Sequence, residues 1–305
     1  MSQNVLSLFS GAGGAVEGFK QAGYSVVAAV DYNEDCVATL KENHPTTLAI
    51  REDLSETSPS EFADRYNIPA ESIDVVVGGP PCQGFSLSGK RELDDDRNKC
   101  IIDFLDYVSF YNPDNVLMEN VSGIMSMADG EVAEHIYENL ERLGYNTVVG
   151  THNAANYGVP QLRERVLFVG KKSDYFSIIA DERRQTVKDV LEKVNKNHPN
   201  HKLPNHGEKV TNMIAETEWG EPIYDSFNKN VRLNPNEPSP TLLAEGWQFG
   251  HPHEPRSLTV HERALLQSFP QDYVFKGNKA PQQHQTGNAV PPKMMKKVAE
   301  YLEVE

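Results

Sequence analysis

One cysteine of this chain stands in a setting that could make it a nucleophile. Cys82 belongs to residues 78–86, GGPPCQGFS, directly after a β-branched run at 73–77 that predicts a buried strand. Two prolines stiffen this turn, and a thiol held on a stiff turn at a strand end is placed for nucleophilic attack. The alternative is a small buried cysteine, the commoner place for a lone thiol. Cys36 and Cys100, inside helical patterns, fit that alternative better than Cys82 does.

A glycine-rich turn follows the first predicted strand, at 5–9. Residues 9–14 read FSGAGG and run into a helical pattern at 16–22. Such a turn lets a ligand approach the backbone and the helix N-terminus, although a plain tight turn would show the same residues. The dinucleotide pattern GxGxxG fails because Val16 occupies the third glycine position, which disfavours a nicotinamide or flavin cofactor.

Acidic residues stand at the ends of the next two predicted strands. Asp31 follows the strand at 25–30 and Tyr32 comes next, while Asp53 lies beyond the strand at 48–50. An acid at such a place can bind ribose hydroxyls, an aromatic ring can stack on adenine, and a second acid can accept from the adenine amino group. Each residue alone would be a helix cap or a surface acid. Together, at successive strand ends, they favour an adenosyl ligand.

The elements that must position these residues alternate along the first 172 residues. Further strands are predicted at 116–118 and 166–169, and further helices at 34–42, 101–110 and 132–143. Strands separated by helices of this length imply right-handed crossovers and a mainly parallel sheet, so the fold class is α/β. Residues 173–250 are polar and show little alternation, which predicts a separate, irregular small domain. Helical periodicity returns at 261–269 and 291–302.

Composition limits the function classes. The 305 residues include three cysteines without CxxC or metal-ligand spacing, so neither a zinc site nor a disulfide framework is expected. A reducing cytoplasm is the expected setting. We see no signal peptide and no apolar run long enough for a membrane span. The net charge of −15 argues, taken alone, against nucleic-acid binding, but it does not exclude a local basic cleft. Residues 161–232 carry 13 Lys and Arg against 11 Asp and Glu.

Taken together, the motifs resemble the cytosine-5 DNA methyltransferase family of the stand-alone prokaryotic type. Residues 79–86 resemble its catalytic motif, and residues 9–14 its first cofactor motif. Residues 118–121 (MENV), 161–165 (QLRER) and 285–292 (QTGNAVPP) are similar to three further motifs, and 256–270 to the segment that supports target recognition. The matches stand in family order. The chain departs from the family pattern at His261 and Leu265, where Arg is usual, and at Thr286, where a bulky aliphatic residue is usual.

The resemblance implies a Rossmann-like, S-adenosylmethionine-dependent methyltransferase sheet with a smaller irregular target-recognition domain. Residues 1–172 plus 282–305 would form the catalytic and cofactor-binding domain, and 173–281 the recognition domain. The implied reaction moves a methyl group from S-adenosylmethionine to carbon 5 of a cytosine flipped out of a specific sequence in duplex DNA. The implied setting is a monomer in the prokaryotic cytoplasm near the nucleoid, in restriction-modification or as an orphan methylase; a companion restriction endonuclease would not be stably bound.

The resemblance also implies roles for single residues. Cys82 would attack carbon 6, since carbon 5 is a poor nucleophile before a thiolate adds. Glu119 would hydrogen-bond the ring nitrogen and amino group, and Arg163 and Arg165 would bind the base carbonyl and a nearby phosphate. The expected cofactor-binding residues are Phe9, Ser10, Gly11, Gly13, Gly14, Asp31, Tyr32, Asp53, Pro80, Asn288 and Val290. The expected DNA-binding residues are Gln83, Ser86, Ser88, Lys90, Arg91 and Thr241. No metal is expected.

The polar loop at 86–99 is a candidate lid that closes on DNA, with an ordinary mobile surface loop as its alternative. Two other functions remain open. A tRNA cytosine-5 methyltransferase of the related branch would carry a Cys-Phe-Thr signature, and this chain has no cysteine after Cys100. A DNA-binding regulator that keeps only the cofactor fold would not need Cys82, Glu119 and the two arginines, which are all present.

Overall fold

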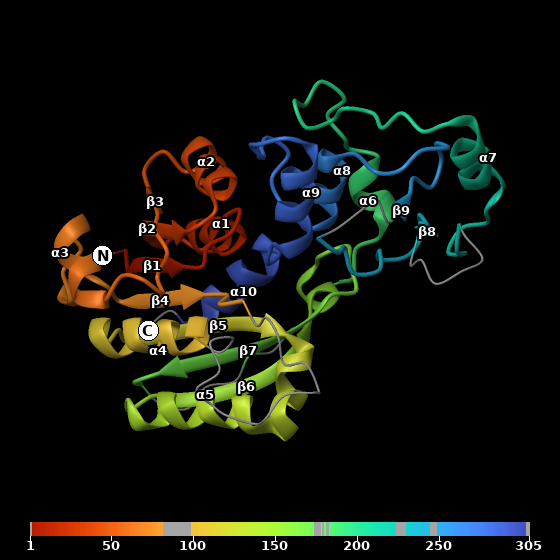
Figure 1. Cartoon of the computed structure of the whole chain (residues 1–305). Coiled ribbons are helices and arrows are strands. Elements are labelled where there is room, and N and C mark those ends of the chain that lie inside the picture. The colour runs from red at the N-terminus through yellow and green to blue at the C-terminus, as the bar shows by residue number, and fades with distance from the viewer. Residues whose placement is uncertain are drawn as a thin grey trace. The chain divides into compact units, whose positions relative to one another are not determined.

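The computed structural model describes residues 2–81, 99–173, 178, 180, 183–223, 230–244 and 249–302. The chain forms two compact units (Figure 1). The first unit contains 1–152, 164–179 and 295–305, and the second contains 153–163 and 180–294. Residues 153–163 and 282–294, which the resemblance assigns to the catalytic domain, fall within the second unit. No helix within the described residues is both long and apolar enough to cross a membrane.

The first unit is built on a seven-stranded sheet with the order β3-β2-β1-β4-β5-β7-β6. Its strands are β1 Asn4–Leu8, β2 Ser25–Asp31, β3 Leu48–Arg51, β4 Val75–Gly78, β5 Asn115–Val121, β6 Asn146–Asn153 and β7 Glu164–Lys171. The pairs from β3 through to β5 are parallel, whereas β5 and β7 are antiparallel. The expected α/β class and mainly parallel sheet are confirmed. The sequence did not predict β6, because none of its residues is fully buried and it has no apolar period.

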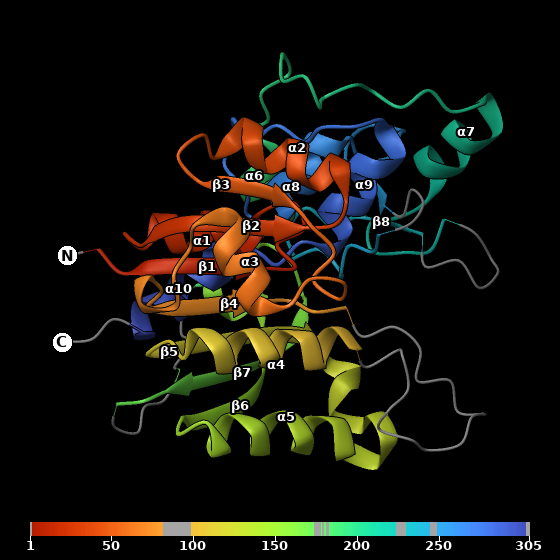
Figure 2. The ribbon, with the colours of Figure 1, turned by 60° about the vertical axis from the view of Figure 1, so that its left-hand side comes forward.

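Helices cover this sheet, with α3, α4 and α5 side by side on one face (Figure 2). The helices of this unit are α1 Gly14–Gln21, α2 Glu34–Asn43, α3 Pro59–Tyr66, α4 Lys99–Tyr111, α5 Glu131–Arg142 and α10 Pro292–Leu302. Two side chains fix α10: the Tyr24 hydroxyl donates to the Ala299 carbonyl at 3.0 Å, and the Lys171 ammonium donates to the Tyr301 carbonyl at 3.1 Å.

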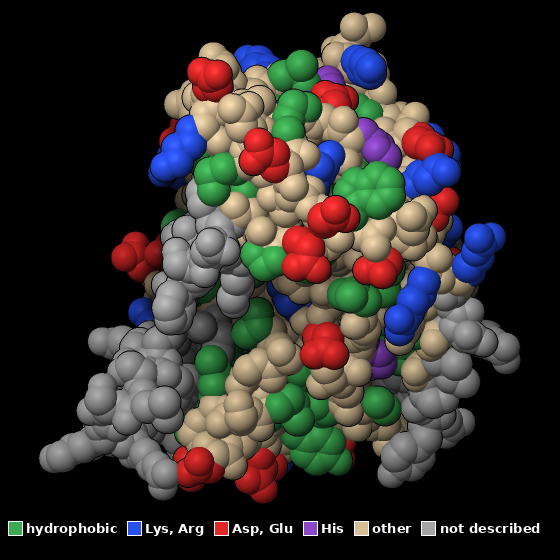
Figure 3. Space-filling view, turned by 90° about the vertical axis from the view of Figure 1, so that its right-hand side faces the viewer, with side chains coloured by type: hydrophobic (Ala, Val, Ile, Leu, Met, Phe, Trp, Pro, Cys, Tyr) green, Lys and Arg blue, Asp and Glu red, His purple; other side chains and the backbone are tan. Residues whose placement is uncertain are grey.

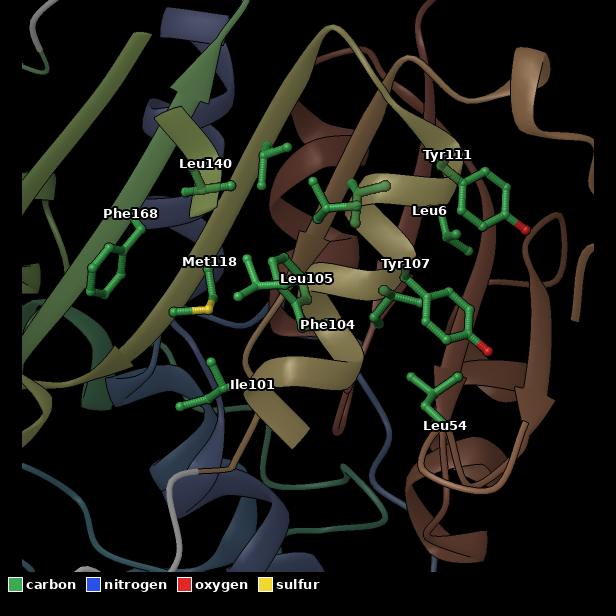
Figure 4. Packing of buried hydrophobic residues seen from close by; sticks show 14 of the residues in the cluster. Leu6, Leu54, Ile101, Phe104, Leu105, Tyr107, Tyr111, Met118, Leu140 and Phe168 are labelled. Carbon is green, nitrogen blue, oxygen red and sulfur yellow. The ribbon is translucent and has the colours of Figure 1, made fainter. Parts of the chain in front are cut away.

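An apolar core lies between the sheet and α3, α4 and α5. Alternate residues of the strands, such as Leu6 on β1, Met118 on β5 and Phe168 on β7, belong to this core, as does Phe104 of α4 (Figure 4). All four side chains are fully buried, and burying a side chain of this size contributes about 1.5–3 kcal/mol. This core sets the positions of the strand ends that carry the candidate site.

The second unit has little regular structure, as expected from its composition. Its elements are α6 Val187–Leu191, α7 Glu208–Glu216, β8 Val231–Arg232, β9 Phe249–Gly250, α8 Val260–Leu266 and α9 Lys279–Asn288, with a 3-10 helix at Ala154–Tyr157. A small apolar cluster contains Val187, Leu233, Leu242, Phe249, Leu258 and Leu266. The helix α9 was not predicted because its ten residues, KAPQQHQTGN, contain almost no apolar side chain.

Candidate active site

The glycine-rich turn after β1 has the conformation that its sequence demands. Gly11 and Gly13 have φ values of 53° and 85°, in the left-handed region that glycine adopts without strain. The Ser10 hydroxyl donates to the Ser7 carbonyl at 2.9 Å and accepts from the Val30 amide at 3.1 Å. The turn is therefore fixed to the end of β2, and Gly14 begins α1 directly behind it.

Asp31 closes this turn from the neighbouring strand. One carboxylate oxygen accepts from the Gly11 amide at 2.7 Å and the other from the Asn33 amide at 2.9 Å. Burial raises the pKa of Asp31 above its usual value, while the two backbone hydrogen bonds act in the opposite direction. The next side chain, Tyr32, is 65% exposed, so its ring is available for stacking on a ligand. Phe9, Ser10, Gly11, Asp31 and Tyr32 thus gather at the ends of two adjacent strands.

A third acid stands one strand further on. Asp53 is exposed just after β3, and its carboxylate accepts from the Ser55 amide at 3.0 Å. Asp103 of α4, which sequence reasoning missed, lies close enough for its pKa to be affected by the charge of Asp53. Burial, as the largest cause, raises the pKa of Asp103 to about 6. Asp103 lies on α4 between the exposed Ile102 and the buried Phe104, so no sequence pattern marked it as a partly buried acid.

The turn after β4 is held by the end of β5. Pro80 is buried, and its carbonyl accepts from the Asn120 side-chain amide at 3.0 Å. The backbone of Gly79 passes so close to Glu119 that an added Cβ would lie 3.1 Å from the carboxylate. Asn120 belongs to the MENV motif but was not singled out from sequence. Its partner lies forty residues away, and no sequence pattern indicates that contact.

Glu119 and Arg165 form an ion pair at the same edge of the sheet. The Arg165 Nε lies 2.7 Å from a Glu119 carboxylate oxygen, and both side chains are nearly buried, at 12% and 11% exposure. The antiparallel register of β5 and β7 pairs Val121 with Arg165, which puts Glu119 diagonally opposite Arg165 on one face. Two of the predicted catalytic residues are thereby brought together, and such a pair can bind a polar heterocycle.

Arg163 lies in the second unit, and its side chain is only 1% exposed. Its guanidinium donates to the Leu242 carbonyl at 3.0 Å and to the Gly287 carbonyl at 2.9 Å. Gln161, also fully buried, bonds the Leu242 amide at 3.0 Å. Arg163 therefore joins two distant segments of the second unit, at Leu242 and Gly287.

The remaining predicted residues differ in what the structure says of them. Cys82, Gln83, Ser86, Ser88, Lys90 and Arg91 lie outside the described residues. The Thr241 hydroxyl donates to the Leu162 carbonyl at 2.6 Å, so in this structure it supports the backbone. Asn288 is exposed and Val290 partly buried in the second unit. Within the described residues, no three His, Cys, Asp or Glu side chains are grouped as metal ligands would be.

Comparison with known proteins identifies the family. The model of the C-5 cytosine-specific DNA methylase family matches residues 3–303. The chain is 35% identical to the type II methyltransferase M1.HphI of Haemophilus parahaemolyticus, over 98% of this chain and 86% of that protein. It is 31% identical to the type II methyltransferase M.DdeI of Desulfomicrobium norvegicum, over 98% and 88%.

Solved structures agree on the fold. A protein described as a DNA modification methyltransferase encoded within an E. coli prophage superposes with a TM-score of 0.83 at 27% identity, covering 99% of this chain and 98% of that one. Spodoptera frugiperda DNMT2 superposes with a TM-score of 0.73 at 17% identity, covering 99% of both chains, and shows the fold alone. The family and its fold depend in general on S-adenosylmethionine. The chain belongs to the C-5 cytosine-specific DNA methylase family and is a DNA cytosine-5 methyltransferase.

Proposed function

We propose that Cys82 is the nucleophile of this methyltransferase and that the Glu119–Arg165 pair binds the target cytosine. The observation that carries the proposal is the nearly buried 2.7 Å ion pair at the end of β5. The neighbouring Asn120 fixes the Pro80 carbonyl, two residues before Cys82. This short separation along the sequence supports Cys82 as the residue that acts together with the ion pair.

The proposed reaction begins when the Cys82 thiolate adds to carbon 6 of a cytosine that has left the base stack. Glu119 hydrogen-bonds the ring nitrogen and the amino group, which favours the protonation that relieves the developing negative charge. Arg165 donates to the base carbonyl while it holds Glu119 in place. S-adenosylmethionine supplies the methyl group that carbon 5 takes up. Loss of the carbon-5 proton then restores the double bond and expels the Cys82 thiolate.

The turn after β1 and the ends of β2 and β3 fit an adenosyl ligand. Each Asp31 oxygen accepts one backbone hydrogen bond and has a further lone pair for a ribose hydroxyl. The exposed Tyr32 ring offers a face for adenine, and the exposed Asp53 carboxylate an acceptor for its amino group. Gly13, Gly14 and Pro80 would complete this part of the site. The contributions of Asn288 and Val290, in the second unit, rest on the family resemblance.

The second unit is proposed to recognise the DNA sequence. Arg163 would act by holding the segments that present recognition residues, with Thr241 among them. Since the named relatives are type II methyltransferases, a companion restriction endonuclease that does not bind stably is part of the proposal. We further propose that the protein acts as a monomer at the nucleoid, in the cytoplasm of a prokaryote.

The substitution Cys82→Ser tests the nucleophile. Methylated cytosines in DNA from cells expressing the protein first identify the target sequence. A duplex with 5-fluorocytosine at that position should then trap the wild-type protein covalently, because the adduct cannot lose fluorine as it loses a proton. Cys82→Ser should give no trapped complex and no methyl transfer, while calorimetry shows S-adenosylmethionine binding within about threefold of wild type.

The matched control is Cys100→Ser, a partly exposed thiol on α4, which should trap normally. A covalent complex formed by Cys82→Ser would contradict the assignment. Methyl transfer by the wild-type protein to tRNA with none to duplex DNA would contradict the choice of substrate.

A further inference from the structure

Trp219 exposes an aromatic ring that neither the apolar cluster of the second unit nor the proposed chemistry uses. The residue stands between α7 and β8, and 47% of its surface is exposed. The Trp219 Nε1 donates to the Pro252 carbonyl at 2.8 Å, so the ring's single polar atom is already bonded and its exposed surface is apolar carbon. By contrast, the phenylalanine and tyrosine side chains that the structure describes in this unit are buried: Tyr157, Phe249, Phe269, Tyr273 and Phe275.

The backbone around Trp219 is fixed by Arg232. The Arg232 guanidinium donates to the Thr217 carbonyl at 2.8 Å and to the Pro252 carbonyl at 2.9 Å. The Arg232 carbonyl accepts from the Gly220 amide at 2.7 Å. The chain is thus held on both sides of Trp219, and the indole shares its acceptor with the arginine. Holding the ring in one place lowers the conformational entropy that it would lose on binding a partner.

His253 lies against the same ring. The two rings meet edge to face, with 5.7 Å between their centroids and 88° between their planes. His253 is exposed, and its backbone belongs to a fixed turn, because the buried His251 Nδ1 accepts from the His253 and Glu254 amides at 3.1 Å each. The pair therefore presents a rigid apolar face beside an imidazole that can donate or accept a hydrogen bond.

Such a pair suits a contact with DNA bases better than a contact with phosphates. In the major groove, base edges present the thymine methyl group and ring carbon atoms next to hydrogen-bond donors and acceptors. Phosphates are bound chiefly by Lys, Arg and backbone amides, and an indole whose N–H is already bonded offers them no donor. Duplex DNA can approach this unit, since it carries 15 Lys and Arg against 14 Asp and Glu, whereas the first unit carries 14 against 30.

We propose that Trp219, with His253 beside it, contacts the base edges of the recognised DNA sequence and determines part of the sequence specificity. This inference rests on the proposed role of the second unit in recognition. Trp219 would pack against the methyl group or carbon edge of a pyrimidine, and His253 would bond the edge of a neighbouring base. A base contact affects the choice between sequences, whereas a phosphate contact affects all sequences equally.

Kinetic discrimination tests the contact with Trp219→Ala and Trp219→Phe. Methyl transfer is measured on the identified duplex and on duplexes changed at one base pair of the sequence. For Trp219→Ala, the ratio of kcat/KM between the identified duplex and one of the changed duplexes should fall about tenfold, as for the loss of one base-pair contact. Trp219→Phe keeps an apolar ring and should retain the ratio within about threefold. Leu203→Ala, at an exposed leucine of the same unit, is the control and should leave every ratio unchanged.

Fluorescence tests whether DNA covers the ring. Trp247→Phe leaves Trp219 as the single tryptophan of the chain. Acrylamide quenches an exposed indole, so a saturating amount of the identified duplex should reduce the quenching constant about threefold or more, as for a ring buried in an interface. A duplex without the sequence should shield the ring less. If Trp247→Phe binds DNA weakly, the difference between wild type and Trp219→Phe gives the same quantity.

A Trp219→Ala variant that loses kcat/KM equally on every duplex, or loses none, would overturn the inference, as would equal quenching with and without the duplex. The recognition role of the second unit is tested separately by photo-cross-linking, with 5-iodouracil at each thymine in and beside the sequence. A cross-link to Trp219 or His253 supports the contact. Cross-links elsewhere in residues 180–294 would exclude the contact and keep the recognition role, and cross-links confined to the first unit would contradict both.

Discussion

The two units of the chain differ sharply in charge. The first unit carries 14 Lys and Arg against 30 Asp and Glu, whereas the second carries 15 against 14. Figure 3 shows the face on the α7 side of Figure 1, where Lys and Arg side chains alternate with Asp and Glu. The first unit therefore has a net charge of −16 and the second of +1, which together give the −15 of the chain. The net charge of a whole chain says little about the part that meets a polyanion.

The units also differ in how they are stabilised. The first has a continuous apolar core between sheet and helices. In the second, buried polar side chains hold loops through their backbone: Arg263 donates to the Leu243 and Gln283 carbonyls, and Gln267 to the Thr286 carbonyl. Burial lowers the pKa of Arg263 to about 10, still far above neutrality. A unit held in this way loses more folding free energy when one hydrogen-bond donor is removed or one close backbone contact is disturbed.

The largest expected effect comes from Gly287→Ala in the second unit. An added Cβ would lie 2.2 Å from the Leu243 carbonyl oxygen, where neither backbone segment can yield without breaking the Arg163 and Arg263 hydrogen bonds. We expect a loss of about 3 kcal/mol or more in the free energy of unfolding. Urea denaturation measures it, and the second unit should unfold first.

Gly207→Ala is the control for this substitution. Nothing lies within 4 Å of the carbon it adds, and at this helix N-cap the cost should not exceed about 1 kcal/mol. If Gly287→Ala and the wild-type protein had equal urea midpoints, the close contact of Gly287 with the Leu243 backbone would not stabilise the second unit.

The next largest expected effect is the pH dependence of stability that His261 causes. Its ring stacks on His198 at 4.0 Å between centroids, and both are nearly fully buried. Burial, as the largest cause, and the neighbouring His198 and His201 together lower the pKa of His261 to about 4. The unfolded state thus binds the proton more readily, so stability is lost as pH falls from about 6.5 towards 4, by up to about 2 kcal/mol between pH 7 and 5.

His261→Gln should make the urea midpoint less sensitive to pH in this window, while His284→Gln, at an exposed position, should not. Because burial also lowers the pKa of His44 in the first unit to about 4, some acid sensitivity will remain. If the dependence of His261→Gln matched that of wild type, the stacked pair would not be a source of acid sensitivity.

The smallest expected effect belongs to the first unit. Ser58 and Glu61 form a capping box at the start of α3, and Ser58→Ala should cost about 1 kcal/mol of unfolding free energy. Thermal denaturation of Ser58→Ala is compared with that of Ser109→Ala, an exposed position on α4. A similar change for both serines would show that the cap contributes nothing.

The same difference between the units decides what the sequence could predict. Runs of apolar residues predicted β1, β2, β4, β5 and β7, because a buried strand shows such a run in its own sequence. The family resemblance assigned Glu119 and Arg165 to one site, but their ion pair was not predicted from the sequence. The helix α3 was missed although its signals, Ser58, Pro59 and Glu61, were present.

No local sequence pattern indicates the contacts that hold the second unit together. The partners of Arg163, at Leu242 and Gly287, lie 79 and 124 residues away, and they are carbonyl groups that every residue has. The family resemblance assigned Arg163 to the base carbonyl and a nearby phosphate of the substrate. A buried arginine that holds backbone carbonyls cannot be told from one that binds a base until the fold is known.

Gln161 and Arg163 bond the amide and carbonyl of Leu242 and the carbonyl of Gly287, atoms that do not depend on side-chain identity. Divergence at the surface of residues 239–244 would therefore leave this junction intact, provided that position 287 stays glycine. Under the proposed recognition role of the second unit, new DNA specificities could arise by changes at these surface positions. An exchange of recognition segments between relatives would need to preserve only Gln161, Arg163 and Gly287 at this point.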